Sequence, residues 1–571
     1  MAHRCFVILR RFAQPLCALL PIQALYSRPT LRLTTLNLVV ALWLLLLLNR
    51  PFWSALWQAT GGWDSGHLGF LLTLPLFVLA WLWLVVEALT WGLAAKPMLV
   101  LLLLASAAAS YFMNTYGVVF DRIMIANLVE THRAEVLELL NGRLAASLLA
   151  FGVLPALLLW RVRLLRQRWP RQLLAKGIAM AAAASCMVLL VAPFFQSYAA
   201  LLRNHRELRF QLVPTNVLGA AHGYARSRWA APVTLQAVGT DAIRRPQAVA
   251  GAKPRLLLLM VGETARAANF SLNGYGRPTN PALGAMADLV NFRQVSSCGT
   301  STAVSLPCMF LDVGRARFDD ELARHRESLL DVVQRAGVAV LWRDNNSGCK
   351  GVCDRVPHED LSAAQVPGLC DGGECHDEIL LDGLQAWIDR QDHDALVVLH
   401  MKGSHGPAYH LRYPPAFEFF KPACKADEID RCEREQIVNA YDNTLRYTDH
   451  VLALTIELLR RNGGRFDTSM LYVSDHGESL GEHGVYLHGL PYSMAPREQT
   501  HVPMLLWLSP ALREHAGIDA ACLERRRDEP LSHDHLYHSV LDLLGVQTQA
   551  YRAERDLLRG CIAALPTPRT P

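Results

Sequence analysis

The first 202 residues contain five long apolar runs, whereas the rest of the chain alternates short apolar runs with polar segments. The long runs cover residues 33–49, 68–89, 97–120, 144–160 and 177–202. A helix needs about 20 residues to cross about 30 Å of hydrocarbon. We therefore expect five transmembrane helices, the first and fourth lengthened by flanking residues. A buried core helix is the alternative for one run, but five in series are too many for one soluble core.

Basic residues near the ends of these runs predict the orientation of the helices. Arginines cluster before residue 33 and again between residues 161 and 171, and positive residues favour the cytoplasmic side of a membrane. With five spans, both clusters and the loop at Lys96 face the cytoplasm. The segment 121–143 and everything after residue 202 then face outward. Residues 1–27 lack the pattern of a cleaved signal peptide.

The second half of the chain has the pattern of an α/β domain. Apolar runs typical of buried strands lie at 255–261, 337–341, 395–401 and 470–474, and segments typical of helices at 319–334, 378–388, 434–461 and 532–544. This alternation predicts a mostly parallel central sheet. The polar, proline-containing stretch between 203 and 253 is typical of a linker on the membrane surface.

Composition and charge agree with this division. Of 571 residues, 51% are hydrophobic and only 19% are charged, which excludes a disordered chain. Residues 1–200 carry 16 Lys and Arg against 6 Asp and Glu, and the remainder carries 40 against 45. The net charge of +5 therefore reflects the flanks of membrane helices, and no nucleic-acid partner is expected.

Ten of the 13 cysteines lie in the second half, and most of them form close pairs. The pairs are Cys298 with Cys308, Cys349 with Cys353, Cys370 with Cys375 and Cys424 with Cys432, which leaves Cys522 and Cys561 over. Close pairs outside the cytoplasm predict disulfides. Zinc clusters are the alternative, but no CxxC motif is followed by a matching second one.

Polar residues follow the predicted strands, where parallel sheets bind their ligands. Glu263 follows the first strand, and Asp475 and His476 follow the last. These oxygen and nitrogen donors suit zinc, with an open position for catalysis. A nucleophile is expected among the hydroxyls of residues 296–302, which precede a helix start. Composition does not choose among these hydroxyls, and an N-cap is the alternative interpretation.

Six motifs stand out in the second half of the chain: GETAR, GYGRPTNP, SCGTSTAVSLPCMF, DNNSGCKGVCDRVP, GSHGPAYHLRYP and SDHGESLGEHGVYLHG. Together they closely resemble the lipid A phosphoethanolamine transferases, membrane-anchored enzymes of the alkaline phosphatase/sulfatase superfamily. The resemblance covers nearly the whole chain. It implies a multi-pass protein of the bacterial inner membrane, with a five-helix N-terminal transmembrane domain and a periplasmic α/β domain of the sulfatase type. The expected divisions are a cytoplasmic tail at 1–30, the membrane domain at 31–202 with a periplasmic helix segment at 121–143, a linker with an interfacial helix at 203–253, and the catalytic domain at 254–571.

The resemblance also implies roles for individual residues. It makes Glu263, Thr300, Asp475 and His476 the ligands of one zinc ion and Thr300 the nucleophile. It makes Lys350, His405 and His488 ligands of the phosphoryl group or of a second zinc, with one histidine as general acid or base and with Ser347 and Glu478 as weaker candidates. His483 stands where many relatives have Asn, and is left outside the main site.

A helix in the segment 121–143 is expected to bind the donor's head group. Asn127, Thr131 and Glu135 would share one face of this helix. Without the resemblance, an amphipathic surface helix is the simpler interpretation. The resemblance implies that these three residues hold the ethanolamine.

The reaction implied is a ping-pong transfer by a monomeric enzyme. Phosphatidylethanolamine donates phosphoethanolamine to threonine and leaves as diacylglycerol, and lipid A or the lipopolysaccharide core accepts the group. The alternatives are a phosphoglycerol transferase of the same superfamily and a catalytically inactive membrane scaffold. Masking a phosphate with an ammonium would weaken the attraction of cationic peptides, which predicts resistance to polymyxin.

Overall fold

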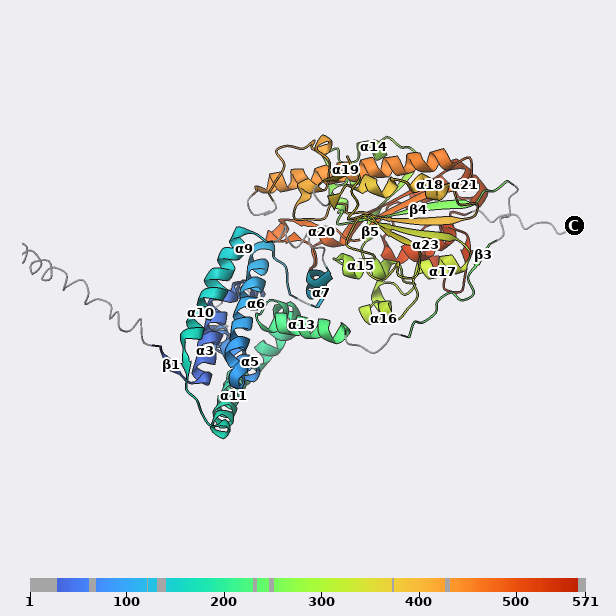
Figure 1. Ribbon diagram of the computed structural model, residues 1–571. Coiled ribbons are helices and arrows are strands. Elements are labelled where there is room, and N and C mark those ends of the chain that lie inside the picture. Colours follow the sequence, from blue (N-terminus) through green and yellow to red (C-terminus); the bar gives the residue numbers. More distant parts are fainter. Residues whose placement is uncertain are drawn as a thin grey trace, which may run out of the picture. The chain divides into compact units, whose positions relative to one another are not determined.

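A computed structural model describes residues 28–60, 68–120, 122–130, 140–228, 234–245, 251–371, 374–426 and 432–562 (Figure 1). The chain divides into two compact units. The helical unit comprises Met1–Asn114 and Gly142–Leu218, and the sheet unit comprises Thr115–Asn141 and Gly219–Pro571. The segment Thr115–Asn141, which lies between two membrane helices in the sequence, therefore belongs to the sheet unit. The domain boundaries expected from the sequence stay predictions.

The helical unit is built from long apolar helices. Its helices are α3 (Leu33–Trp43), η1 (Leu44–Leu48), α4 (Arg50–Ala59), α5 (Leu68–Leu89), η3 (Gly92–Ala94), α6 (Ala95–Tyr116), α9 (Gly142–Ser147), η4 (Leu148–Val153), α10 (Leu154–Arg161), α11 (Trp169–Val191), η5 (Ala192–Phe194), α12 (Phe195–Asn204), η6 (Arg206–Phe210) and the start of α13 (Thr215–Arg228). Short parallel strands β1 (Thr30–Leu31) and β2 (Arg163–Leu164) pair beside them.

Within the described residues, four helices are long and apolar enough to cross a membrane. They are Leu68–Leu89, Gly92–Tyr116, Gly142–Arg161 and Trp169–Ala199. A fifth span results if Leu33–Leu48 and Arg50–Ala59, which bend by 66° at Asn49, count as one. Pro51 lies in the first turn after this bend, where its missing N–H group is tolerated. The expectation of five apolar segments is confirmed in this form.

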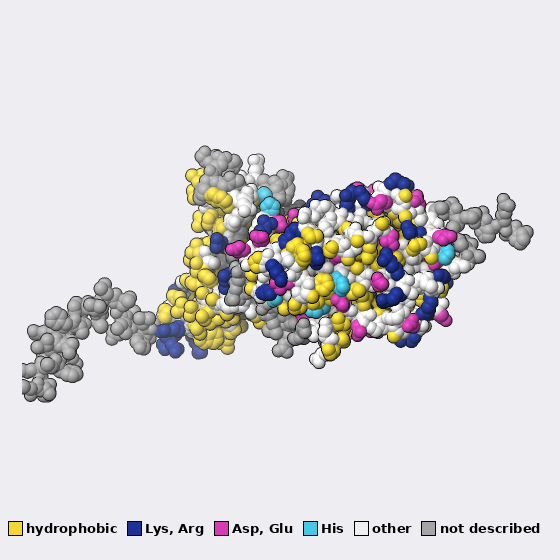
Figure 2. Space-filling view, turned by 90° about the horizontal axis from the view of Figure 1, so that it is seen from above, with side chains coloured by type: hydrophobic (Ala, Val, Ile, Leu, Met, Phe, Trp, Pro, Cys, Tyr) yellow, Lys and Arg dark blue, Asp and Glu magenta, His cyan; other side chains and the backbone are white. Residues whose placement is uncertain are grey.

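The surface of the helical unit is apolar (Figure 2). Leu46 is 71% exposed and Leu189 is 72% exposed. On the sheet unit, charged side chains of both signs are scattered among apolar ones (Figure 2). An apolar outer surface suits contact with lipid chains and not with water.

A buried polar network joins helices α3, α5 and α11. Lys176 Nζ on α11 lies 2.7 Å from Glu87 Oε2 on α5, and both side chains are excluded from solvent. Lys176 also donates to Thr90 Oγ1 at 3.3 Å, and Asn37 on α3 donates to the same hydroxyl at 2.8 Å. Charges inside an apolar helix bundle must be paired, so this network fixes which helices are neighbours.

The sheet unit contains an eight-stranded sheet of order β15-β5-β14-β11-β4-β10-β6-β7. Its strands are β4 (Arg255–Gly262), β5 (Leu289–Ser296), β6 (Ala339–Asp344), β7 (His358–Asp360), β10 (Ala395–His400), β11 (Asp467–Ser474), β14 (His501–Leu508) and β15 (Leu531–Ser532). Strand β14 runs antiparallel to both of its neighbours, β11 and β5, and the other pairs are parallel. The predicted mostly parallel sheet is confirmed.

Helices cover both faces of this sheet (Figure 1). Successive residues of β4 alternate between two hydrophobic clusters: Leu257 and Leu259 pack with α17 and α23, and Leu258 and Met260 pack with α18 and α19. The α-helices of the whole sheet unit are α7 (Arg122–Glu130), the end of α13, α14 (Pro281–Gly284), α15 (Thr302–Met309), α16 (Asp320–Arg324), α17 (Leu329–Arg335), α18 (Leu384–Ile388), α19 (Arg434–Asn462), α20 (Arg497–Thr500), α21 (Pro510–Ala516), α22 (Ala520–Arg525) and α23 (Leu536–Leu543). Burial on both faces explains the continuous apolar runs of the parallel strands.

Smaller elements complete the sheet unit. Three two-stranded sheets pair β3 (Ile243–Arg244) with β16 (Val546–Gln547), β8 (Cys370–Asp371) with β9 (Glu374–Cys375), and β12 (Ser479–Leu480) with β13 (Tyr486–Leu487). The helix expected at 319–334 is split into α16 and α17, because Ser328 begins α17 with a capping box. The helix expected at 378–388 is 3₁₀-helical over Asp377–Leu381 and becomes α18 after Gly383, whose φ is +68°.

Five disulfides link the cysteines of the sheet unit. The four predicted pairs are bonded as expected. The two remaining cysteines, Cys522 and Cys561, form the fifth bond across 39 residues of sequence. The sequence did not predict this bond, because the two cysteines are far apart along the chain.

The buried ion pair predicts a clear mutational signature. Lys176→Met leaves the carboxylate of Glu87 buried without its cation, which costs about 3–5 kcal/mol when one partner of such a pair is removed. We expect a lower thermal unfolding temperature in detergent for this variant. The double variant Lys176→Met/Glu87→Leu should recover most of the loss, because neither charge remains. Equal destabilisation by the single and double variants would contradict a charge-pairing role.

Candidate metal centre

Five strand ends of the sheet unit converge on one edge of the sheet. Strands β4, β10 and β6 are parallel to β11, and β5 has the same direction because β14 is antiparallel to both β5 and β11. The register pairs Ser474 of β11 with Gly262 of β4. The next residues, Asp475 and Glu263, therefore leave the sheet side by side.

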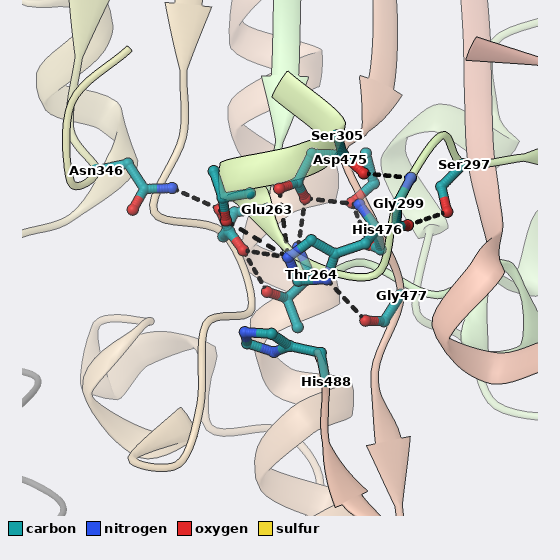
Figure 3. A network of polar contacts seen from close by, with 12 residues as sticks. Glu263, Thr264, Ser297, Gly299, Ser305, Asn346, Asp475, His476, Gly477 and His488 are labelled. Atoms are coloured by element: carbon teal, nitrogen blue, oxygen red, sulfur yellow. Dashed lines mark hydrogen bonds and ion pairs between the residues drawn. The ribbon is translucent and has the colours of Figure 1, made fainter. Parts of the chain in front are cut away.

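Glu263, Asp475 and His476 form a compact, fully buried cluster (Figure 3). His476 Nε2 lies 3.1 Å from Glu263 Oε1 and 3.3 Å from Asp475 Oδ2. One candidate ligand atom from each of the three residues lies within 4.8 Å of the others. Among the described residues, the other such group contains Cys349 and Cys353, which are bonded to each other.

Backbone groups orient the donor atoms toward a common point. Asp475 Oδ1 accepts hydrogen bonds from the N–H groups of Thr264 and His476, at 3.1 and 2.7 Å. Asp475 Oδ2 is buried and accepts no hydrogen bond from the described part of the chain. The ring atom His476 Nδ1 lies 2.9 Å from the carbonyl of Gly477, which assigns the proton to Nδ1. Nε2 therefore faces the carboxylates, and its lone pair becomes available to a metal ion when its proton leaves.

Two glycines allow the loops to approach the cluster closely. Gly403 has a φ of +56°, and a Cβ there would lie 2.5 Å from the carbonyl oxygen of Glu263. A Cβ on Gly477 would lie 2.0 Å from the carbonyl oxygen of Glu498. Any larger residue at either position would push these loops away from the strand ends.

The electrostatics of the cluster favour a bound cation. Burial, followed by the neighbouring Glu263 carboxylate, raises the pKa of Asp475 to about 6. Burial opposes a charge on His476, but the two carboxylates raise its pKa to about 10. A proton on this ring is the positive charge that the two acids need. A divalent cation can replace that proton, and the unshared Asp475 Oδ2 and His476 Nε2 provide its donors. The residues present therefore fit a zinc-type ion.

Two threonine hydroxyls reach the cluster. Thr264 Oγ1, on the residue after Glu263, donates to Glu263 Oε1 at 2.6 Å, and the second hydroxyl belongs to Thr302 at the start of α15. Thr302 Oγ1 donates to Glu263 Oε2 at 2.9 Å and lies 3.4 Å from His476 Nε2. The hydroxyl of Thr300 instead donates to the carbonyl of Leu490 at 2.6 Å. This differs from the expectation for Thr300, and the reason is local: helix α15 begins at Thr302, which directs this side chain toward the strand ends, whereas residue 300 is held by the 489–490 segment.

Three further residues support the cluster and were absent from the expected set. Asn346 follows β6 and donates to Glu263 Oε2 at 2.7 Å (Figure 3). His400 ends β10, and its ring lies 2.9 Å from Asp344 Oδ2 and 3.3 Å from Asn346 Nδ2. His533 accepts from the N–H of Cys298 and lies 2.9 Å from the carbonyl of Ser474. Strand-end position was a signal for the first two, but His533 lies far along the chain.

His533 joins the hydroxyl-bearing turn to the end of β11 as a neutral ring. Burial lowers its pKa to about 4, so Nδ1 accepts and Nε2–H donates at ordinary pH. The disulfide between Cys298 and Cys308 fastens the same turn to helix α15. Thr302 is thus held from both sides.

Of the residues expected to bind a phosphoryl group, the two histidines lie beside the cluster. The ring of His488 is 4.3 Å from that of His476 and 5.4 Å from that of His405. His488 Nδ1 lies 3.3 Å from the buried Glu478, whose pKa is raised by burial. Lys350, with a φ of +51°, donates to the carbonyl and hydroxyl of Ser347 at 2.9 and 3.2 Å. His483 is exposed.

The expected head-group residues are only partly described. The backbone of Asn127 lies in helix α7, which belongs to the sheet unit. Thr131 and Glu135 lie outside the described residues. Their role stays a prediction.

Comparison with known proteins gives consistent matches along the chain. Residues 78–229 match the family model described as phosphoethanolamine transferase EptA/EptB, and residues 255–546 match the sulfatase model. The chain is 42% identical to phosphoethanolamine transferase EptA of Escherichia coli K12, over 95% of this chain and 99% of that protein. It is 46% identical to EptA of Salmonella typhimurium LT2, over 80% of this chain and 84% of that protein.

A solved structure matches both units. It is the integral membrane protein lipooligosaccharide phosphoethanolamine transferase A of Neisseria meningitidis, with a TM-score of 0.90 and 38% identity. The match covers 94% of this chain and 100% of that chain. The expected family resemblance, fold class and membrane location are confirmed.

Titration of the cluster predicts a pH-dependent metal affinity. Between pH 6 and 10 a cation must displace one proton, that of His476, and below pH 6 it must also displace the proton of Asp475. As the pH is lowered, the apparent affinity for Zn²⁺ should therefore fall about tenfold per pH unit above pH 6 and about 100-fold per unit below it. Competition with a chromophoric chelator measures this slope on the metal-stripped protein.

Two variants separate the cluster from non-specific binding. Asp475→Asn should abolish tight Zn²⁺ binding, whereas Asp354→Asn, at an exposed acid beside the Cys349–Cys353 disulfide, should leave it unchanged. A single slope across pH 6 would argue against the displacement of a second proton from Asp475.

Proposed function

Because the chain belongs to the phosphoethanolamine transferase EptA family, we propose that it transfers phosphoethanolamine from phosphatidylethanolamine to lipid A with Thr302 as the nucleophile. Its helices lie in the inner membrane and its sulfatase-like domain lies in the periplasm. The observation that carries the proposal is the hydrogen bond from Thr302 to Glu263, beside His476, at the start of α15.

Glu263, Asp475, His476 and Thr302 would hold one zinc ion. When bound there, zinc would lower the pKa of the threonine hydroxyl and offset the negative charge of the phosphodiester. The carboxylate of Glu263 already accepts a hydrogen bond from Thr302, and Asn346 donates a second hydrogen bond to the same oxygen, Oε2. Burial of the cluster keeps water from competing with Thr302 for the phosphorus atom.

The first half of the reaction forms a phosphothreonine ester. Thr302 Oγ1 attacks the phosphorus of phosphatidylethanolamine, its proton passes to Glu263, and the bond from phosphorus to the glycerol oxygen breaks. The departing diacylglycerol oxygen takes a proton from the paired imidazoles of His405 and His488. In the second half, a phosphate group of lipid A gives its proton to the imidazole pair and its oxygen attacks the phosphorus of the ester. The bond from phosphorus to Thr302 Oγ1 breaks, and Oγ1 regains its proton from Glu263.

Cationic and polar groups bind the transferred group. Lys350 acts as a point charge on a non-bridging phosphoryl oxygen, and Ser347 fixes its ammonium group. We assign His405 and His488 to the phosphoryl group as well. Asn127, Thr131 and Glu135 are assigned to the ethanolamine, where a carboxylate opposite the ammonium makes chemical sense.

Replacing each threonine in turn tests the nucleophile. Thr302→Ala should lower diacylglycerol release from labelled phosphatidylethanolamine about 1,000-fold or more, because it removes the hydroxyl that is proposed to form the ester. Thr300→Ala removes a hydroxyl that binds a backbone carbonyl and should retain activity within about tenfold. The opposite ranking of the two variants would show Thr300 to be the nucleophile.

Consumption of the donor separates this proposal from its rivals. With phosphatidylethanolamine and phosphatidylglycerol supplied together, only the former should be consumed. Preference for phosphatidylglycerol would favour a phosphoglycerol transferase, and absence of turnover would favour an inactive scaffold.

Modification of lipid A predicts reduced sensitivity to polymyxin. Each added phosphoethanolamine places an ammonium over a phosphate and weakens the attraction of a polycation. Cells expressing the protein should survive higher polymyxin concentrations than cells expressing Thr302→Ala. Equal sensitivity, despite modified lipid A in the mass spectrum, would refute the link.

A further inference from the structure

A cavity of about 430 Å³ lies beside helix α15 in the sheet unit. Its volume falls within the range of ligand pockets in proteins. Ala303 and Lys350 line it. Ala303 follows the proposed nucleophile Thr302 in the sequence, and Lys350 is the proposed phosphoryl ligand. The cavity therefore lies next to the reacting groups without containing the zinc ligands.

One wall of the cavity is apolar. Val304, Pro307 and Leu311 contribute to it from α15 and the turn that follows, and Ala126 contributes from α7. Tyr224 on α13 adds an aromatic ring. Such a ring and apolar surface can pack against the C–H face of a sugar, which buries apolar area as any other contact does.

The rest of the lining is rich in charged groups of both signs. It includes Arg324, Arg326 and Arg355 together with Asp320 and Asp354. Two of these arginines are held rigidly: Arg326 binds Asp312 with two bonds of 2.6 Å, and Arg355 binds Asp331 with two bonds of 2.7 Å. Neither of these two carboxylates lines the cavity. Basic and acidic residues thus line the space together.

This combination matches a phosphorylated sugar. Carboxylates accept hydrogen bonds from sugar hydroxyls, and guanidinium and ammonium groups bind phosphate. The phosphoethanolamine of the donor would pair with one acid and one base of this lining, but it has no sugar ring to pack against Tyr224 and the apolar residues. The proposed function also assigns its ammonium to Asn127, Thr131 and Glu135. The acceptor of the proposed reaction is a phosphorylated glycolipid, and its phosphate must come to Thr302.

We infer that the α15 cavity binds a phosphorylated sugar of the acceptor and determines which acceptor is used. The inference rests on the proposed function, because it takes the acceptor class from it. A sugar seated against Tyr224 and the arginines would place a phosphate near Lys350, at the end of the cavity closest to Thr302.

Two variants test this on the full-length enzyme in detergent. Ala323→Trp, at a half-buried lining residue of α16, fills the cavity, and Arg324→Glu, at an exposed lining residue, reverses a charge. The matched control is Arg461→Glu, an exposed arginine of α19 outside the cavity. The first readout is the burst of diacylglycerol released from phosphatidylethanolamine without acceptor. The second is the rate of transfer to lipid A.

Both cavity variants should transfer to lipid A at least about tenfold more slowly and keep the diacylglycerol burst within about twofold of the parent protein. The control should match the parent in both readouts. Glucosamine 1-phosphate should compete with lipid A in the parent and much less in Arg324→Glu, whereas inorganic phosphate at the same concentration should not compete in either. Competition by inorganic phosphate alone would assign the cavity to free phosphate and overturn the inference.

Other outcomes would also overturn it. Equal loss of both readouts would assign the cavity to the donor, and unchanged transfer in Ala323→Trp would show that the acceptor does not enter it. If Ala323→Trp lowers the unfolding temperature, the two readouts of Arg324→Glu, at an exposed position, decide whether the acceptor binds in the cavity. A parent protein that releases no diacylglycerol would refute the proposed function itself, which is a different pattern from a selective failure in transfer.

Discussion

Two carboxylates and an imidazole, buried together where parallel strands end, are the constraint on which the sheet unit depends. Removing charges from water costs several kcal/mol for each ion, and Glu263 and Asp475 also repel each other. The chain offsets this with backbone N–H donors, the Asn346 amide and a proton on His476. A single divalent cation would balance both carboxylate charges. The cluster is therefore unfavourable as a purely structural feature and favourable as a metal centre.

The sheet fixes the geometry of this cluster more strongly than any loop does. The alternating burial of β4 against two hydrophobic clusters sets its register with β11. A slip of one residue would turn every side chain to the wrong face, so the pairing of Gly262 with Ser474 is rigidly determined. Glu263 and Asp475 inherit this precision because they are the next residues. Thr302 lacks such a strand, and His533 and the Cys298–Cys308 disulfide hold its turn in place.

The sequence allowed prediction of those parts that depend on local pattern. The strands buried on both faces were visible as apolar runs, and the acids and histidine after them were visible as strand-end residues. Strands β5 and β14 were not predicted: β5 alternates buried and partly exposed residues, and β14 contains Pro503 at an irregular point of its pairing. The choice between Thr300 and Thr302 depends on where α15 begins, and the contacts of His533 and the Cys522–Cys561 bond depend on tertiary folding.

In the proposed reaction one nucleophile serves two lipids in turn, which requires two kinds of recognition. The diacylglycerol oxygen and the acceptor phosphate oxygen must each lie opposite Thr302 at the phosphorus atom, so one must leave before the other arrives. Protein groups around the phosphorus atom contact both lipids in turn. They can therefore recognise only the phosphoethanolamine, which takes part in both half-reactions. Any preference among acceptors must therefore come from contacts away from the line that joins Thr302 Oγ1, the phosphorus atom and the entering or leaving oxygen. The α15 cavity has this location, since Ala303 and Lys350 border it while Glu263, Asp475 and His476 do not. If the two tasks are separated in this way, a change in the cavity lining can alter the preferred acceptor without a change in the strand-end cluster.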